Sequence, residues 1–511
     1  MRKKNTYANV LANIVYTLVI MAFTFVNRKV FLTQLNVTYF GLNSLCVDIL
    51  SMLSLAELGI GQAMVYALYK PFAKNDKPTI KAYLKIYRVM YRYVALTVLG
   101  IGIILLFFLP ILVKEEVDMK LVYTVFLLYL LNSVVSYLLS YKRSVLFANQ
   151  QAYKMVYADM IFKVMSIACQ IAVLLLTRDM ITYVLVVIVF TIGGNVYVNR
   201  MVTRKYPFLR NLSDAAGISP AQKKDVIKNV KALSIHNLGN FCVKNTDNII
   251  ISYFLTLGVV GIFSNYMFLV VSIGSIIAKI FDAATASIGN LIVEKDEAKT
   301  YSVFNMGFFI NFIVALWVTA LVCTCMQVLI TLWLGEEYLF PDMIVYLISG
   351  YLYLQLMRSN IYSFKTASGI FDQDKFFPVL QSVANLGLSV LLVHWLGVSG
   401  IFIAKIVISF FLINWVHAFF TYKYTLNIPV GRYFEKMFVY SGTTFLICVF
   451  SVFICSRLFP EYCIVNLIYR VLCTSGIVAL ITILLFHKTK EYRCLINLIS
   501  EQWNKFRPKS A

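Results

Sequence analysis

The stretch YRYVALTVLGIGIILLFFLPILV, residues 91–113, contains a single charged residue, Arg92. A helix of about 20 apolar residues crosses the hydrocarbon core of a bilayer, so this stretch predicts a membrane span. Similar stretches recur along the whole chain of 511 residues, which is 60% hydrophobic and 14% charged. Soluble globular proteins have about 25% charged residues. The sequence therefore predicts an all-α integral membrane protein and excludes a soluble enzyme with one membrane anchor.

The predicted spans fall into groups of six, six and two, with a polar, Pro-containing segment at residues 200–231 between the first two groups. Because six is an even number, the two groups share their orientation in the membrane. We therefore predict about 14 transmembrane helices, as two six-helix lobes in parallel pseudo-repeat plus two C-terminal helices. The predicted domains are an N-terminal lobe (1–199), a cytoplasmic linker (200–231), a C-terminal lobe (232–421), an extra two-helix pair (422–487) and a cytoplasmic tail (488–511).

A short sequence repeat supports the two-lobe division. Gly41, in the turn into the second predicted span, is matched by Gly261 at a similar position in the second half. Such a repeat is what the duplication of a six-helix bundle would leave in the sequence.

Basic residues predict the orientation of the chain. With a cytoplasmic N-terminus, the cytoplasmic segments carry 34 Lys or Arg residues and the outer loops carry six. Lys and Arg concentrate in cytoplasmic loops, so both termini are predicted to be cytoplasmic. We attribute the net charge of +22 to these cytoplasmic Lys and Arg residues. It does not indicate nucleic-acid binding, since the sequence contains no basic soluble module that could hold DNA or RNA.

Motifs for catalysis and cofactor binding are absent from the sequence. There is no GxxxxGK[ST] nucleotide loop, no HExxH motif and no CxxC pair, and the chain has only four histidines. The outer loops are too short to form a catalytic domain. We therefore predict no enzyme activity, no cofactor and no metal site, and transport driven by gradients.

Six basic residues lie within the predicted spans: Lys163, Lys244, Lys279, Arg358, Lys405 and Arg470. A charge at the centre of a span costs about 2.5–3.5 kcal/mol on insertion scales, so such residues usually face a partner or a wet cavity. Asp159 precedes Lys163 by one helical turn, and we predict that these two form an ion pair. Arg358 and Lys405 have no acid within a turn, so they are predicted to meet an anionic ligand. Pairing across helices or snorkelling is the alternative for them, and Arg470 is predicted to snorkel.

Polar residues at helical spacing on the first, seventh, eighth and tenth spans predict a water-filled path. Hydrogen bonding between helices of a dry bundle is the alternative interpretation. The predicted cationic, substrate-binding cavity consists of Arg28, Lys244, Lys279, Arg358 and Lys405. The predicted polar or coupling positions of the cavity are Asn13, Asn237, Asn240, Asp247, Gln355, Tyr362 and Glu57.

Four stretches carry a family resemblance: NRKVFLTQLNVTYFGLNSL (27–45), LSLAELGIGQA (53–63), TDNIIIS (246–252) and VGIFSNY (260–266). They resemble the Wzx-type polysaccharide flippases of the multidrug/oligosaccharidyl-lipid/polysaccharide exporter superfamily. The resemblance implies two lobes around a cationic cavity and alternating access. It also implies an undecaprenyl-diphosphate-linked oligosaccharide as substrate. Family positions fall on Arg28 and Asp247, whereas the other predicted cavity cations depend on helical geometry alone.

The resemblance further implies a role in surface polysaccharide biosynthesis in the bacterial cytoplasmic membrane. Membrane lipids, a polysaccharide polymerase and glycosyltransferases are the implied partners. A lipid II flippase and a cation-coupled drug or metabolite exporter of the same superfamily are the alternatives. An exporter of cations would favour an acidic cavity, whereas the unpaired charges within the spans are basic. A membrane glycosyltransferase would need carboxylates or a metal site near an outer loop, and none is apparent.

Overall fold

The computed structural model describes residues 2–57, 59–114, 117–212, 214, 220, 224–228, 230, 246–370, 373–374 and 376–506. Helices account for nearly all of these residues, and the described ranges contain no strand. The prediction of an all-α membrane fold is confirmed.

Eleven helices of the described part are long and apolar enough to cross a membrane. Ten of them are α1 (Arg2–Gln34), α4 (Lys77–Leu106), α6 (Met119–Ser140), α8 (Ala152–Thr177), α9 (Met180–Lys205), α12 (Leu257–Val293), α13 (Glu297–Trp333), α15 (Phe377–Leu396), α18 (Gly431–Leu458) and α19 (Ile464–Phe486). The eleventh, Val398–Leu426, runs from α16 (Val398–Ile408) through η4 (Ser409–Asn414) and α17 (Trp415–Thr421) to η5 (Tyr422–Leu426).

The other predicted spans take different forms. The second is broken into α2 (Val37–Leu53), η1 (Ser54–Glu57) and α3 (Ile60–Ala73). The tenth is α14 (Asp342–Ala367). Of the seventh, the structure describes the end, as α11 (Asp247–Phe254). Short segments complete the described chain: α5 (Leu109–Leu112), α7 (Arg143–Ala148), η2 (Pro207–Leu209), η3 (Glu336–Tyr338) and α20 (Lys490–Phe506).

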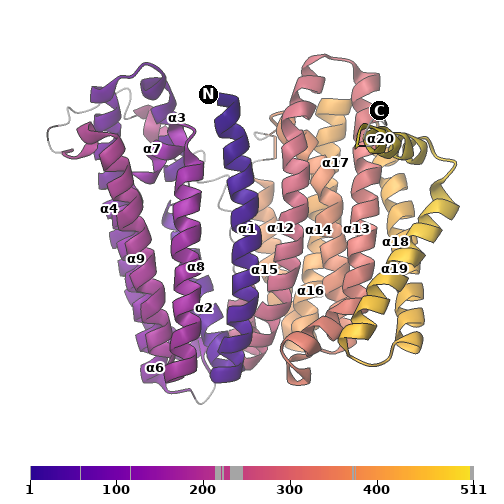
Figure 1. Cartoon of the computed structure of the whole chain (residues 1–511), viewed down its shortest axis with the longest axis horizontal. Helices are drawn as coiled ribbons and strands as arrows, with labels where there is room; N and C mark the ends of the chain where they lie inside the picture. Colours follow the sequence, from indigo (N-terminus) through magenta and orange to yellow (C-terminus); the bar gives the residue numbers. More distant parts are fainter. Residues whose placement is uncertain are drawn as a thin grey trace, which may run out of the picture. The chain divides into compact units, whose positions relative to one another are not determined.

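The chain divides into two compact units, Met1–Ser264 and Asn265–Ala511. In the first unit α1 packs on α8, α8 on α9, α9 on α6, and α6 on α4 (Figure 1). In the second unit α13 packs against α14, α18 and α19, while α16 packs against α14 and α15. The boundary at Ser264 falls inside the predicted C-terminal lobe (232–421), and the predicted domain limits stay a prediction.

Two glycines allow a close helix contact within the first unit. A Cβ atom at Gly41 of α2 would lie 1.9 Å from the carbonyl oxygen of Leu257, at the start of α12. A Cβ atom at Gly261 would lie 2.4 Å from the carbonyl oxygen of Val37. Because any side chain would collide with backbone, only glycine permits this approach. These are the two glycines that the sequence repeat pairs with each other.

Candidate functional site

Two adjoining cavities open within the first unit. The inner cavity has a volume of about 390 Å³, and its charged lining residues are Glu57, Arg143, Asp159 and Lys163. The tyrosine cavity has a volume of about 870 Å³ and is lined by α3, α4 and α7. Both volumes are typical of ligand pockets. Glu57, Ser140 and Arg143 line both cavities, so the two adjoin at these residues.

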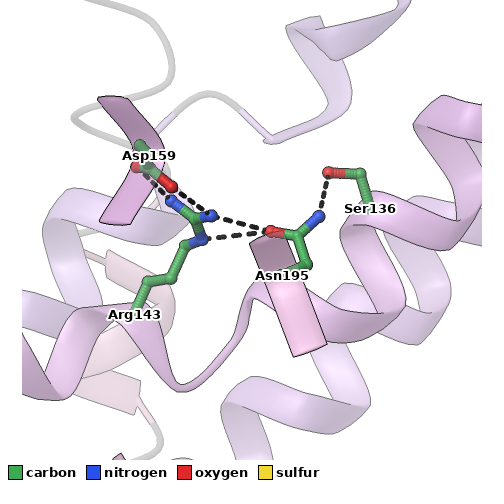
Figure 2. A network of polar contacts seen from close by, with 4 residues as sticks. All are labelled: Ser136, Arg143, Asp159 and Asn195. Atoms are coloured by element: carbon green, nitrogen blue, oxygen red, sulfur yellow. Dashed lines mark hydrogen bonds and ion pairs between the residues drawn. The ribbon is translucent and has the colours of Figure 1, made fainter. Parts of the chain in front are cut away.

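A short break in one membrane helix positions Arg143. The helix α6 ends at Ser140, and α7 begins at Arg143 after two turn residues. Figure 2 shows the guanidinium of Arg143 directed at Asp159 of α8 and at Asn195 of α9. Its Nη1 and Nη2 donate to the two carboxylate oxygens of Asp159 at 2.8 and 2.9 Å. Its Nε and Nη2 donate to Asn195 Oδ1 at 3.2 and 2.8 Å, and Asn195 Nδ2 donates to Ser136 Oγ at 3.0 Å. The network joins α6, α7, α8 and α9.

The predicted ion pair between Asp159 and Lys163 is wrong. Asp159 pairs with Arg143 instead, because the guanidinium fork reaches both carboxylate oxygens, whereas an ammonium is a point charge. Lys163 lies near the middle of α8, with its side chain exposed on the wall of the inner cavity. Within the described ranges, no carboxylate forms an ion pair with Lys163.

The second carboxylate of the inner cavity is held by a tyrosine pair. Glu57 is the last residue of η1, two residues before Gly59, whose φ of 84° marks the break of the second span. The carboxylate of Glu57 accepts a hydrogen bond from the Tyr91 hydroxyl, and the Tyr87 hydroxyl donates to that of Tyr91 at 3.0 Å. Both acids of the cavity are therefore engaged by other groups, which leaves the ammonium of Lys163 for a ligand.

Glu57 was predicted for the site and lines both cavities, whereas the other predicted residues of the first unit lie elsewhere. Arg28 is half-buried; its Nη1 donates to the carbonyl oxygen of Ser264 at 2.9 Å, and its guanidinium lies 5.0 Å from the ring centroid of Phe40. Asp247 is buried at the first residue of α11. Asn13 is exposed on α1 and donates to the carbonyl of Asn9 at 2.8 Å.

Three further predicted positions, Asn237, Asn240 and Lys244, lie outside the described residues.

The second unit carries the other predicted cations, most of them near α14. Arg358 is half-buried on α14, and no described carboxylate forms an ion pair with it. Lys405 is buried in α16, with its ammonium 5.2 Å from the ring centroid of Tyr351. Tyr362 is exposed, one turn beyond Arg358, and its ring lies 5.7 Å from that of His417.

Two further predicted residues of the second unit are associated with α12: Gln355 contacts this helix, and Lys279 is part of it. Gln355 of α14 packs against α12 at Gly274, where a Cβ atom would lie 3.2 Å from the amide nitrogen of Gln355. Lys279 is half-buried on α12. The role of each predicted cation in binding substrate stays a prediction.

Arg470 is anchored rather than snorkelling, so that prediction is wrong. It is buried in α19, and its Nε and Nη2 donate to the Phe459 carbonyl at 3.1 and 2.6 Å. Its Nη1 donates to the Thr324 carbonyl at 2.8 Å. Backbone carbonyls satisfy this guanidinium inside the second unit, which makes it a structural residue.

The sequence interpretation missed Arg143 as a site residue. Arg143 stands at the end of a predicted span, where basic residues are typical of cytoplasmic loops. The break after Ser140 contains neither Gly nor Pro, so the usual signals of a helix end are missing. Asn195 lies in an apolar part of α9 with no charged residue within a turn, so it gave no signal either.

No protein-family model matches the chain, and no curated protein matches it. Solved structures do match its fold. An inward-facing multidrug resistance MATE family transporter of the MOP superfamily is 14% identical, with a TM-score of 0.62 over 80% of this chain and 97% of that one. The lipid II flippase MurJ in an inward closed conformation is 12% identical, with a TM-score of 0.64 over 95% of this chain and 99% of that one. The chain has the fold of the MOP superfamily transporters.

A third solved structure has the same fold. It is a MOP superfamily transporter from Pyrococcus furiosus, 11% identical, with a TM-score of 0.52 over 84% of this chain and 97% of that one. At these identities the likeness concerns the fold. The predicted fold is confirmed at this level, and the role and the substrate class are separate questions.

Proposed function

We propose that this chain is a flippase that moves an undecaprenyl-diphosphate-linked oligosaccharide across the bacterial cytoplasmic membrane by alternating access. The observation that supports the proposal most is Lys163, a cation near the middle of a membrane helix that faces a cavity and has no carboxylate partner among the described residues. A diphosphate headgroup cannot cross hydrocarbon unaccompanied, and a cavity with an available ammonium can hold it.

The arrangement around Lys163 explains why it is available. Asp159 would neutralise Lys163 if the two were paired, but both of its carboxylate oxygens accept hydrogen bonds from Arg143, whose guanidinium also donates to Asn195. The guanidinium of Arg143 is itself neutralised by Asp159, so it orients the site rather than adding net charge. In the second unit, Arg358 offers another cation without a described carboxylate partner.

The fold comparisons support a flippase over a drug exporter within this proposal. The lipid II flippase matches 95% of the chain, whereas the MATE transporter matches 80%. An exporter of cationic drugs would also need an available carboxylate, and both acids of the inner cavity are engaged. The lipid II flippase alternative shares the diphosphate headgroup and therefore has to be separated from the proposal by experiment.

The test is depletion of the protein in its host, followed by extraction of lipid-linked intermediates. We expect oligosaccharide-charged undecaprenyl diphosphate to accumulate on the cytoplasmic face, and surface polysaccharide to disappear. Accumulation of lipid II with cell lysis would favour the alternative flippase. Loss of drug resistance without either lipid would overturn the proposal in favour of the exporter.

A charge series at Lys163 locates the activity in the inner cavity. Expression of Lys163→Glu in the depleted strain is expected to give no surface polysaccharide. Lys163→Arg keeps the positive charge, so it is expected to restore a large part of the surface polysaccharide. The matched control is Lys120→Glu, which reverses an exposed charge at the start of α6. Full activity of Lys163→Glu would remove this residue from the site. The proposed arrangement has both termini in the cytoplasm, with glycosyltransferases supplying the substrate and a polymerase taking the product.

A further inference from the structure

The tyrosine cavity adjoins the inner cavity, and its lining residues lie mainly on α3, α4 and α7, which contact one another in the first unit. Its wall is unusual for a membrane bundle because four tyrosines line it, Tyr66 and Tyr69 of α3 and Tyr87 and Tyr91 of α4. A cavity for a lipid chain would instead be lined by aliphatic side chains. By contrast, the cavity of about 260 Å³ between α12 and α13 in the second unit is lined by Leu, Ile, Val, Met and Cys.

The four tyrosines form two pairs, of which one is hydrogen-bonded within the protein and the other is exposed. Tyr87 and Tyr91 are committed to each other, with ring centroids 4.6 Å apart at 77°, and to Glu57 through the hydroxyl of Tyr91. Tyr66 and Tyr69 are 67% and 48% exposed, although both line the cavity. In the described part of the chain, their hydroxyls make no hydrogen bond. These two rings are therefore free to contact a ligand.

Exposed tyrosine rings at i and i+3 suit a sugar. A pyranose has an apolar face of C–H groups and a rim of hydroxyls, and a tyrosine offers an apolar ring with one polar end. Gln62 precedes Tyr66 by one turn of α3 and lines the same cavity, so it adds an amide that can donate and accept hydrogen bonds with hydroxyls. The wall thus combines stacking surfaces with uncharged polar groups.

The position of this wall relative to Lys163 matches a diphosphate linked to a glycan. The two cavities adjoin at Glu57, Ser140 and Arg143, so a sugar in one would lie beside a diphosphate in the other. Resting on the proposed function, we infer that the tyrosine cavity binds the first sugars of the lipid-linked glycan through Tyr66, Tyr69 and Gln62, while Lys163 in the inner cavity binds the diphosphate.

The experiment measures lipid binding to the purified full-length protein by native mass spectrometry. The probes are undecaprenyl diphosphate and the same lipid carrying a hexose, an N-acetylhexosamine or a disaccharide. Wild-type protein is expected to bind at least one glycosylated probe about tenfold more tightly than bare undecaprenyl diphosphate. The double variant Tyr66→Ala/Tyr69→Ala is expected to lose this preference but to bind the bare lipid normally.

Controls separate this inference from the proposed function. Tyr93→Ala removes an equally exposed tyrosine of α4 that is not part of the cavity wall, and it is expected to keep the preference. Tyr66→Phe/Tyr69→Phe retains both rings, so it keeps a large part of the preference even if the alanine variant is unstable. Lys163→Gln is expected to weaken the binding of all the lipid probes by the same factor, because all of them carry the diphosphate.

The outcomes are distinct. If wild-type protein binds none of the lipids, the proposed function fails. If it binds them all equally, or if the alanine double variant keeps the wild-type preference, the sugar site is overturned while the proposed function stands. Loss of binding to the bare lipid by the alanine variant would also overturn the assignment of the two cavities to different parts of the substrate.

Discussion

The pairing of Asp159 decides whether Lys163 is available, and a double-mutant cycle tests it. The structure joins Asp159 to Arg143 through two hydrogen bonds of 2.8 and 2.9 Å, with side chains that are 27% and 24% exposed. A hydrogen bond to a charged group contributes about 1.5–3 kcal/mol when buried, whereas an exposed ion pair contributes about 0.2–1 kcal/mol. At this intermediate exposure we expect a coupling energy of about 2 kcal/mol between Arg143 and Asp159.

The cycle compares two pairs that share one carboxylate. Arg143→Gln, Asp159→Asn and their double variant give the first coupling, and Lys163→Gln with Asp159→Asn gives the second. The assay is unfolding of the purified protein by SDS in mixed micelles, followed by circular dichroism. For Lys163 and Asp159 we expect a coupling below about 0.5 kcal/mol, the value of a solvated pair one turn apart. A larger coupling energy of Asp159 with Lys163 than with Arg143 would refute the assigned ion pair. It would also refute the argument that Lys163 is available to bind an anion.

Four further outcomes follow from the geometry. Gly41→Ala is expected to destabilise the protein by about 1–3 kcal/mol, because the new Cβ meets the backbone of α12, whereas Gly100→Ala, with no atom within 4 Å, is neutral in the same SDS titration. Arg470→Met is expected to cost about 2–3 kcal/mol, since it leaves two carbonyls without their donors. Burial acts to raise the pKa of Asp179, but hydrogen bonds from the first turn of α9 outweigh it and hold the pKa below its usual value. That stability is present above the unfolded pKa and is lost as the pH falls through the folded pKa, so Asp179→Asn should flatten the acid limb of a stability-against-pH curve. Lys163→Met is expected to raise the unfolding free energy of the unliganded protein while abolishing transport, and a variant that is less stable yet active would contradict the role given to this cation.

The fold was predictable because each membrane helix must itself be long and apolar enough to cross the bilayer, with its backbone hydrogen bonds made inside the helix. A span such as 91–113 needs only length and apolar composition, and both are visible in the sequence. The uneven distribution of Lys and Arg among the predicted loops then supported the predicted number of spans. What composition did not reveal is the break in the second span, since Glu57 and Gly59 lie within an otherwise continuous apolar pattern.

The candidate site was less predictable because it depends on contacts between helices. The sequence gives the spacing of Asp159 and Lys163 on one helix, but not the approach of Arg143 from α7 or of Asn195 from α9. A tertiary partner with better geometry displaced the local one. Glu57 lines both cavities, but the sequence gave no sign that Tyr91 of α4 would hydrogen-bond to its carboxylate.

The energetic position of Lys163 ties these observations together. A lysine near the middle of a membrane helix costs about 2.5–3.5 kcal/mol to insert, and an ion pair with Asp159 would recover part of that cost within the fold. In the structure Asp159 pairs with Arg143 instead. A hydrophobic residue at position 163 would leave that ion pair unchanged. Because the fold gains nothing from the charge, the benefit has to arise in another state of the protein, when an anion occupies the cavity. The same reasoning does not apply to Arg470, whose carbonyl partners satisfy it without any ligand. The presence or absence of an internal partner therefore separates cations that hold the bundle together from those that can bind substrate.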